Sequence, residues 1–370
     1  MVTPLDDHLT VVAAQGLPGA RPLDATEPLA ESEFGALLRA AGGERIAGHL
    51  VAAIDSGTVP ATDGQRARAQ DRHEAAMAVD LHLERVLVAM SGRLGRDGIE
   101  HRALKGPVLA RTAYPDPALR SFGDVDLLVE GARFDDAVAV AATTSGDVRY
   151  GEPRPGFRSR FGKGVCVVQP DGWEVDLHRV FTSGPFGLAM RAEDVLGDAA
   201  TVTVGGVAVP ALGPTSRFLH ACYHAALGSR RPRRSALRDI AQILHADPPD
   251  PGAAVDVATR WRGRAVLQRA LWLTQDGLAA PIAGSLVEWA ASYRPDRFER
   301  LALAAYTSER ASYAVQAATG IWALGSWRDQ AAYSGALLLP SREYLSEREG
   351  SYLRRWRRAV RLGGRWGPSS

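Results

Sequence analysis

Residues 104–129, which read LKGPVLARTAYPDPALRSFGDVDLLV, place two acids, Asp124 and Asp126, in a stretch that otherwise favours burial. On a β-strand, residues i and i+2 share a face, so Val125 and Leu127 would face a core while both carboxylates face the other way. Alternate Cα positions lie roughly 6 to 7 Å apart, and like charges that close weaken a sheet unless a cation or water separates them. The pattern therefore indicates a metal-binding strand. The alternatives are a solvated strand face, or acids that pair with nearby arginines such as Arg120.

Composition sets wide limits around this stretch. The chain has 370 residues, 46% of them hydrophobic and 23% charged, which is typical of a globular protein long enough for two domains. Its 44 basic and 42 acidic residues give a net charge of +2, so any polyanionic partner would have to bind a local patch. The two cysteines, Cys166 and Cys222, have no metal-ligand spacing, which predicts buried thiols in a reducing compartment.

The sequence also predicts a cytoplasmic location. Its first residues are acidic rather than basic, and their apolar run is too short for a signal sequence. No window of 18 or more apolar residues suggests a membrane-spanning helix.

Four regions follow from the changes in pattern along the chain. Residues 1–28, rich in Pro, Gly and Asp, predict an extended lead-in, and 29–97 predict a helical segment. Within that segment we expect two short helices separated at Gly42 and Gly43, then one long amphipathic helix over about 64–97. Residues 98–213 alternate between strand and helix patterns, and 214–370 predict a helical domain of six or so helices. The expected fold class is α+β.

Within 98–213, we expect strands near Arg102 and over "DVDLLVE", and a helix over "ARFDDAVAVAATTSG". Further strands are expected at about 147–151, 158–169 and 172–178, and a hairpin around Gly205 and Gly206. Breaks in the helical domain are expected near 247–252 and 339–342.

A Lys-Gly turn precedes the paired acids. Gly106 allows a ligand to approach the backbone, and Pro107 fits the first position of a helix, whose free N–H groups favour a phosphate. Lys105 adds a positive charge there and is one of only two lysines, the other being Lys163.

A third acid follows on the alternating strand "WEVDLH". Asp176 and Glu174 share a face of that strand, and either could complete the acidic group. Carboxylate oxygens are the ligands that Mg²⁺ prefers, and it favours sites completed by substrate phosphates. A turn that binds phosphate and three acids together indicate phosphoryl or nucleotidyl transfer.

The run "LKGPVLA…YPDPALRSFGDVDLLV…GWEVDLHR" resembles the nucleotidyltransferase superfamily that shares the DNA polymerase β palm. In particular it is similar to the bacterial "uncharacterised nucleotidyltransferase" branch, in which a Lys-Gly turn replaces the usual Gly-Ser. The resemblance covers about residues 98–245. It implies a mixed sheet with flanking helices and two-metal catalysis. It also implies attack of an acceptor on the α-phosphate of a nucleoside triphosphate, with release of pyrophosphate.

The resemblance assigns roles by position. Asp124 and Asp126 match the paired metal ligands, and Asp176, favoured over Glu174 by its "DLH" context, matches the third acid that serves as base or ligand. The set that matches nucleotide-binding positions is Lys105, Gly106 and Arg120. Because the Gly-Ser is missing, the triphosphate contact is left to Lys105 and backbone groups.

The helical domain offers further candidates. "TSRFLHACYHAAL" and "ALRDIAQIL" resemble the segment that follows the palm, with His220 and His224 at i and i+4 and Asp239 on the next helix. Together with His178 they could line a substrate groove. The alternatives are polar packing for the histidines, and a surface acid or a partner of Arg238 for Asp239.

Two arginine clusters, over 228–238 and 352–367, raise the question of nucleic acid. The second mixes arginines with Trp356 and Trp366, which could stack on bases. Exposed arginines also commonly serve only to solvate a helix face. The first cluster could instead line a triphosphate or acceptor groove.

The leading hypothesis is a Mg²⁺-dependent nucleotidyltransferase of the EC 2.7.7 type, with one or two metal ions. It would move an NMP group from an NTP, with ATP expected, to a hydroxyl or phosphate of an acceptor. One alternative is a catalytically silent module that senses nucleotide or binds a partner. Another is an enzyme that modifies tRNA or a protein.

Overall fold

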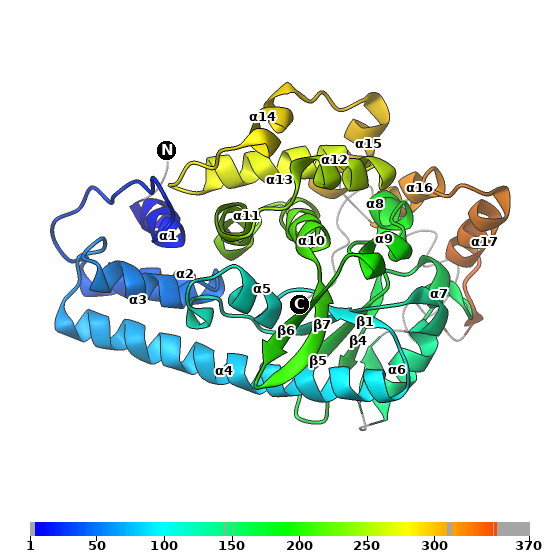
Figure 1. The fold of residues 1–370 in the computed structure, drawn as a ribbon, viewed down its shortest axis with the longest axis horizontal. Coiled ribbons are helices and arrows are strands. Elements are labelled where there is room, and N and C mark those ends of the chain that lie inside the picture. Colours follow the sequence, from blue (N-terminus) through cyan, green and yellow to red (C-terminus); the bar gives the residue numbers. More distant parts are fainter. Residues whose placement is uncertain (1–3, 144–145, 150, 309–312, 343, 346–370) are drawn as a thin grey trace.

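The computed structural model contains a seven-stranded mixed sheet with helices around it (Figure 1). It describes residues 4–143, 146–149, 151–308, 313–342 and 344–345. The strand order is β3-β4-β5-β2-β1-β7-β6. The strands are β1 (His101–Ala103), β2 (Val125–Val129), β3 (Asp147–Arg149), β4 (Gly164–Val168), β5 (Glu174–His178), β6 (Ala199–Val204) and β7 (Val207–Leu212). The expected α+β class is confirmed.

Strand β2 lies in the middle of the sheet. It pairs in parallel with β5 and antiparallel with β1, while β1 pairs in parallel with β7. All five residues of β2 are buried, which explains why its apolar residues are β-branched or Leu. The outer pairs β3–β4, β4–β5 and β6–β7 are antiparallel. The predicted β6–β7 hairpin turns at Gly205 and Gly206, both with positive φ, as the tight turn requires.

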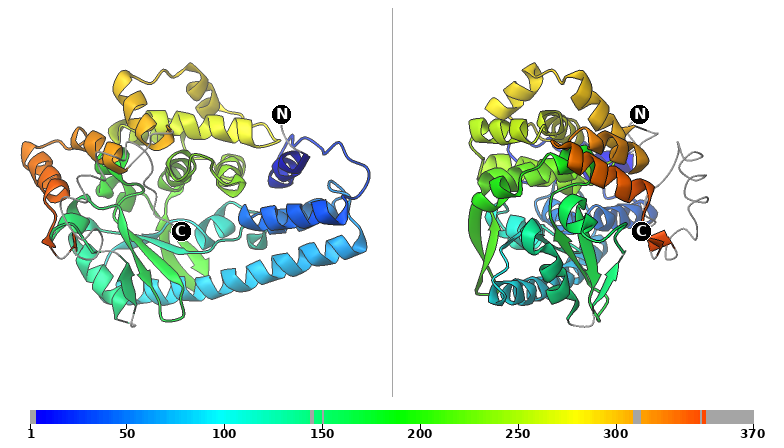
Figure 2. Two further views of the ribbon diagram at one scale, coloured as in Figure 1. Left: turned by 180° about the vertical axis from the view of Figure 1, so that it is seen from behind. Right: turned by 90° about the vertical axis from the view of Figure 1, so that its right-hand side faces the viewer.

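The N-terminal region is helical almost from its start. The extended lead-in was wrong in part, because Pro4–Ala14 form helix α1, whose buried residues Val12 and Ala13 contribute to the core. The two short helices are confirmed as α2 (Glu31–Gly43) and α3 (Ala47–Asp55), and the long one as α4 (Asp63–Arg96). Figure 2 shows α4 running along one side of the molecule, from α2 and α3 to the sheet.

Short helices connect the strands. They are α5 (Pro107–Thr112), α6 (Phe134–Ala142), α7 (Phe157–Phe161), α8 (Gly184–Leu188) and α9 (Ala192–Gly197), with 3₁₀ turns η1 (Pro117–Leu119) and η2 (Gly131–Arg133). The strand expected over 158–169 was wrong in its first half, where α7 lies. Phe157 and Phe161, four residues apart, both pack against the ring of Tyr333, which favours a helical turn over alternation.

Eight helices follow residue 213 in the described part of the chain, where six or so were expected. They are α10 (Pro214–Leu227), α11 (Arg234–Ala246), α12 (Pro251–Arg260), α13 (Arg264–Gly277), α14 (Ser285–Ser292), α15 (Arg297–Thr307), α16 (Tyr313–Ile321) and α17 (Trp327–Leu338). The breaks predicted near 247–252 and 339–342 are confirmed. The arginine–tryptophan segment at 352–367 lies outside the described residues. Among those described, no helix has the combined length and apolarity needed to cross a membrane.

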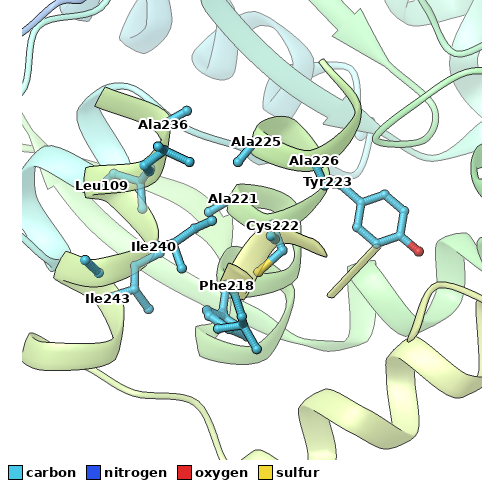
Figure 3. Packing of buried hydrophobic residues seen from close by; sticks show 14 of the residues in the cluster. Leu109, Phe218, Ala221, Cys222, Tyr223, Ala225, Ala226, Ala236, Ile240 and Ile243 are labelled. Atoms are coloured by element: carbon cyan, nitrogen blue, oxygen red, sulfur yellow. The ribbon is translucent and has the colours of Figure 1, made fainter. Parts of the chain in front are cut away.

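Two large hydrophobic cores hold most of the elements together, and a small third cluster packs α7 against α17. One large core lies between α4, α6 and the sheet, and the other joins α1, α2 and α3 to the helices from α10 to α15. Figure 3 shows part of the second core, in which small residues such as Ala221 on α10 and Ala236 on α11 lie near Ile240. The N-terminal and C-terminal helices therefore share one core beside the sheet.

Candidate active site

The register of β2 and β5 brings two acids together. Asp126 lies directly beside Asp176 on the neighbouring parallel strand, and His178 is two residues further along β5. One ligand atom from each of the three lies within 4.8 Å of the others. Asp126 is 7% exposed, whereas Asp176 is half-buried. Two of the predicted metal ligands are thus adjacent in space although 50 positions separate them in the sequence.

Lys105 supplies the cation that the paired acids need. It follows β1, which pairs antiparallel with β2, so the chain turns back beside the start of β2. Its ammonium lies 3.1 Å from Asp124 Oδ2 and 3.1 Å from Asp126 Oδ2. The Lys-Gly turn and the DxD motif therefore meet, as the sequence predicted.

The turn itself depends on Gly106. Its φ of 63° and ψ of −116° lie where glycine is favoured, and a Cβ there would meet the Phe122 ring at 3.3 Å. Helix α5 begins at Pro107 and has only six residues. The nucleotide-binding role of Gly106 stays a prediction.

The two adjacent acids have opposite pKa shifts. Burial alone would raise the pKa of Asp126, but Lys105 and the hydrogen bond from His178 outweigh it and hold that pKa well below its usual range. Burial raises the pKa of Asp176, and the carboxylates of Asp126 and Asp124 raise it further. Two neighbouring acids with well-separated pKa values are typical of catalytic sites, because the acid with the lower pKa stays ionised while the one with the higher pKa can exchange a proton.

His178 belongs to this site rather than to a separate groove. Its Nε2 lies 2.8 Å from Asp126 Oδ1, and its buried Nδ1 has no hydrogen-bond partner among the described residues. Glu174, the competing acid on β5, is not part of the three-residue group. His178 is therefore a third candidate ligand, a role that the sequence alone did not assign.

The two histidines of α10 differ in their burial. His220 is buried against the Phe181 ring, with centroids 4.8 Å apart, and burial lowers its pKa to about 3. It lies close enough to Asp126 and Lys105 for their charges to affect that pKa. His224 is exposed. His220 is thus a buried imidazole near the acids that stays neutral at physiological pH.

Arg120 and Asp239 pair with each other. The Arg120 Nε and Nη2 atoms lie 3.0 and 2.7 Å from the two carboxylate oxygens of Asp239, and both residues are buried. The Tyr114 hydroxyl donates to the same carboxylate at 2.7 Å. Asp239 is thus neither a surface acid nor a partner of Arg238. Because the guanidinium group of Arg120 already binds Asp239, its predicted contact with a phosphate would require this ion pair to break.

Arg45 lies at the paired acids but was not a sequence candidate. Its Nη1 is 3.5 Å from Asp124 Oδ1, and a Cβ on Gly123 would lie 2.7 Å from its Nη2. The residue comes from the bend between α2 and α3, outside the region that carries the motifs. No spacing rule connects it to Asp124, because only the folding of α2 and α3 against the sheet region brings them together.

Asp80 holds the loop that leads into the acids. This residue of α4 accepts a hydrogen bond from the Phe122 backbone N–H at 2.8 Å. Burial raises its pKa to about 6, although the Phe122 hydrogen bond and Arg120 act against that rise. The loop is therefore tied to α4 by a buried carboxyl group whose pKa is raised.

We expect Asp80 to make the protein less stable as pH rises. A carboxyl with a raised pKa in the folded state favours folding below its unfolded pKa, near 4, and loses that contribution as pH passes about 6. The shift corresponds to at most about 3 kcal/mol in the free energy of unfolding. Urea denaturation at pH 4.5 and pH 7.5 should show a smaller pH dependence in Asp80→Asn than in the wild type. Equal pH dependence would contradict this role.

The class of protein to which this fold and acidic cluster belong follows from a comparison with known families. A protein-family model described as "Uncharacterised nucleotidyltransferase" matches residues 30–278, and the chain belongs to this family. Among solved structures, a similar chain is an antigenic nucleotidyltransferase-like protein from Paracoccidioides brasiliensis. It has 17% identity and a TM-score of 0.35, and the match covers 55% of this chain and 95% of that one. A search of curated proteins found no match.

The residues present fit a divalent metal ion. Nucleotidyltransferases generally use such an ion, and Asp126, Asp176 and His178 form a compact group that could hold one. The ammonium of Lys105 shows that a cation is accommodated between Asp124 and Asp126. Oxygen ligands dominate the group, which suits a hard ion.

Proposed function

We propose that this chain transfers a nucleoside monophosphate from a nucleoside triphosphate, with ATP expected, to a hydroxyl or phosphate of an acceptor. Support comes chiefly from one observation. Three carboxylates and one lysine converge where β1 ends and where β2 and β5 run side by side. In the proposed reaction an acceptor oxygen forms a bond to the α-phosphorus, the bond to the β-phosphate oxygen breaks, and pyrophosphate leaves.

Each residue has a proposed role. Asp124 and Asp126 would hold Mg²⁺, which when bound would supply charge stabilisation at the α-phosphate. Asp176, with its raised pKa, would accept the proton of the acceptor hydroxyl or serve as a further ligand. Lys105 would leave the acids for a phosphate oxygen of the nucleotide once the metal neutralises them. We leave Arg120 out of the phosphate contacts because Asp239 occupies its fork.

Metal-dependent nucleotide binding tests this proposal. A non-hydrolysable ATP analogue should bind the wild-type protein in isothermal titration with Mg²⁺ and should not bind with EDTA. Binding that does not depend on the metal would argue against the assignment. Binding without pyrophosphate release in any acceptor screen would favour the silent nucleotide-sensing alternative. A steep loss of tRNA binding with salt would favour the tRNA alternative.

Replacement of Lys105 should affect metal and nucleotide in opposite directions. In Lys105→Met the internal cation is gone, so Asp124 and Asp126 should bind Mn²⁺ about tenfold more tightly, because close carboxylates need a counter-charge. The ATP analogue should bind about tenfold more weakly for lack of a charged phosphate contact. Electron paramagnetic resonance of Mn²⁺ and isothermal titration measure the two affinities.

The other lysine provides the matched control. Lys163 is exposed and has no ion pair among the described residues, although its charge reaches His220 near the acids. Lys163→Met should therefore change both affinities by less than about twofold, far less than Lys105→Met. If Lys105→Met also leaves both unchanged, Lys105 serves neither as the counter-ion nor as the phosphate contact.

A further inference from the structure

A groove opens beside the paired acids, outside the set of residues used above for metal and nucleotide. Two arginines, Arg45 and Arg72, provide its charge. Its walls come from the bend after α2, from one face of α4 and from the loop before β2. The full lining is Gly42, Arg45, Ala47, Arg72, Ala75, Ala76, Val79, Ser121 and Phe122. The groove thus combines a cationic part with a largely apolar surface.

Two glycines allow these arginines to approach the backbone. A Cβ on Gly42 would lie 2.6 Å from Arg72 Nη2, and one on Gly123 would lie 2.7 Å from Arg45 Nη2. Arg45 itself has a φ of 58°, in the left-handed region that costs a non-glycine residue roughly 1 kcal/mol. The backbone therefore places both guanidinium groups at the groove at some cost in conformational energy.

Positive charge exceeds negative charge here. Burial lowers the pKa of Arg45, and the nearby cations Arg233 and Arg120 lower it further, against the effect of Asp124. Asp124 is the only carboxylate in an ion pair with Arg45 among the described residues, and it already pairs with Lys105. No described carboxylate forms an ion pair with Arg72. The exposed Arg233 adds a third guanidinium within electrostatic range of Arg45.

We propose that this groove binds the phosphate monoester of an acceptor whose body is apolar or a ring. Arg45 and Arg72 would bind the phosphate dianion, because guanidinium groups match its oxygens in pairs. The apolar body would lie against Ala76, Val79 and Phe122. Naming the ligand as the acceptor rests on the proposed function, whereas the phosphate site itself does not.

The groove fits the acceptor better than the nucleotide. The Phe122 ring packs against Gly106 and also lines the groove, so it stands between the Lys-Gly turn and the groove. At the other end, Arg45 lies 3.5 Å from Asp124. A molecule held by its phosphate in the groove would therefore lie next to the acids, on a different side from a nucleotide at the turn.

Phenyl phosphate is a suitable probe, because it joins a ring to a phosphate dianion. In isothermal titration without nucleotide, it should bind the wild type and bind the Arg45→Gln/Arg72→Gln double variant at least tenfold more weakly. Phenol, which lacks the charge, should not bind, and inorganic phosphate should bind more weakly than phenyl phosphate. Arg85→Gln removes an exposed arginine of the same helix α4 that is not at the groove, and should change nothing.

Several outcomes would overturn the site. One is equal binding of phenyl phosphate by the wild type and the double variant, once circular dichroism shows that both are folded. Another is binding of phenol as tight as that of phenyl phosphate. The third is a loss of affinity in Arg85→Gln as large as in the double variant. The single variants Arg45→Gln and Arg72→Gln should each bind phenyl phosphate more weakly than the wild type does. If neither does, and only an unfolded double variant loses binding, the proposal is contradicted.

Competition separates the acceptor from the nucleotide. With the ATP analogue and Mg²⁺ at saturation, phenyl phosphate should still bind. If the analogue displaces it competitively, the groove belongs to the nucleotide and the acceptor assignment is wrong. If the analogue never binds the wild type, the proposed function fails and the acceptor assignment falls with it, while the titration without nucleotide still decides the phosphate site.

Discussion

An Asp126→Asn variant is expected to bind Mn²⁺ and the metal-dependent ATP analogue about 100-fold or more weakly than the wild type. The amide keeps the shape of the side chain but removes the charge that faces Lys105 at 3.1 Å and His178 at 2.8 Å. Loss even of a group that only supports a ligand commonly costs 10–100-fold in metal affinity, so loss of a ligand should cost more. Mn²⁺ paramagnetic resonance and isothermal titration measure both effects.

Glu174→Gln is the matched control for this variant. Glu174 lies on β5 two residues before Asp176, yet it is not part of the compact group. Its replacement should leave metal affinity within about twofold. If Glu174→Gln weakens Mn²⁺ binding as much as Asp126→Asn does, the third acid has been assigned to the wrong residue. If folded Asp126→Asn binds Mn²⁺ as tightly as the wild type does, the assignment of these acids as metal ligands is wrong.

Local periodicity predicts the centre of the site. Asp124 and Asp126 could be found because strands alternate with a period of two, and a carboxylate at an otherwise apolar strand stands out. Asp176 shares its strand face with Glu174, and only the resemblance of its DLH context to the family motif favoured it. Lys105 could be found because Gly106 and Pro107 mark a turn into a helix. These signals need only a few neighbouring residues. The structure supplies what they lack, namely the register that places Asp126 beside Asp176.

Contacts between distant segments were not predictable in the same way. Arg45 reaches Asp124 only because α2 and α3 fold against the sheet region, and nothing in the local sequence marks Arg45 as different from other arginines. Helix α1 was missed because its surroundings are rich in Pro and Gly. Its helical state is stabilised by burial against α11 and the other helices, which local pattern does not report.

The Arg120–Asp239 pair shows a different limit of sequence reasoning. The resemblance placed Arg120 among the nucleotide-binding residues. Asp239 was a candidate for the substrate groove, with a surface acid or a partner of Arg238 as the alternatives. Their pairing spans 119 positions and joins the loop before β2 to α11. A buried ion pair at that junction fixes the helical region relative to the acids. Arg120 holds the start of the loop that ends at Asp124, and we expect it to affect the site only through the position of that loop.

Asp239→Ala is accordingly expected to lower the free energy of unfolding by about 3 to 5 kcal/mol. The substitution leaves the buried guanidinium of Arg120 without its charge partner and removes the acceptor of the Tyr114 hydroxyl. Urea denaturation measures the loss. Asp276→Ala removes an exposed acid on α13 and should stay within about 0.5 kcal/mol of the wild type. Arg120→Met/Asp239→Leu should recover most of the stability, because it removes both charges together. If Asp239→Ala lowers the free energy of unfolding by less than about 1 kcal/mol, Arg120 must hydrogen-bond to water or to another partner. Arg120 would then be free to bind a phosphate, and the prediction would be wrong.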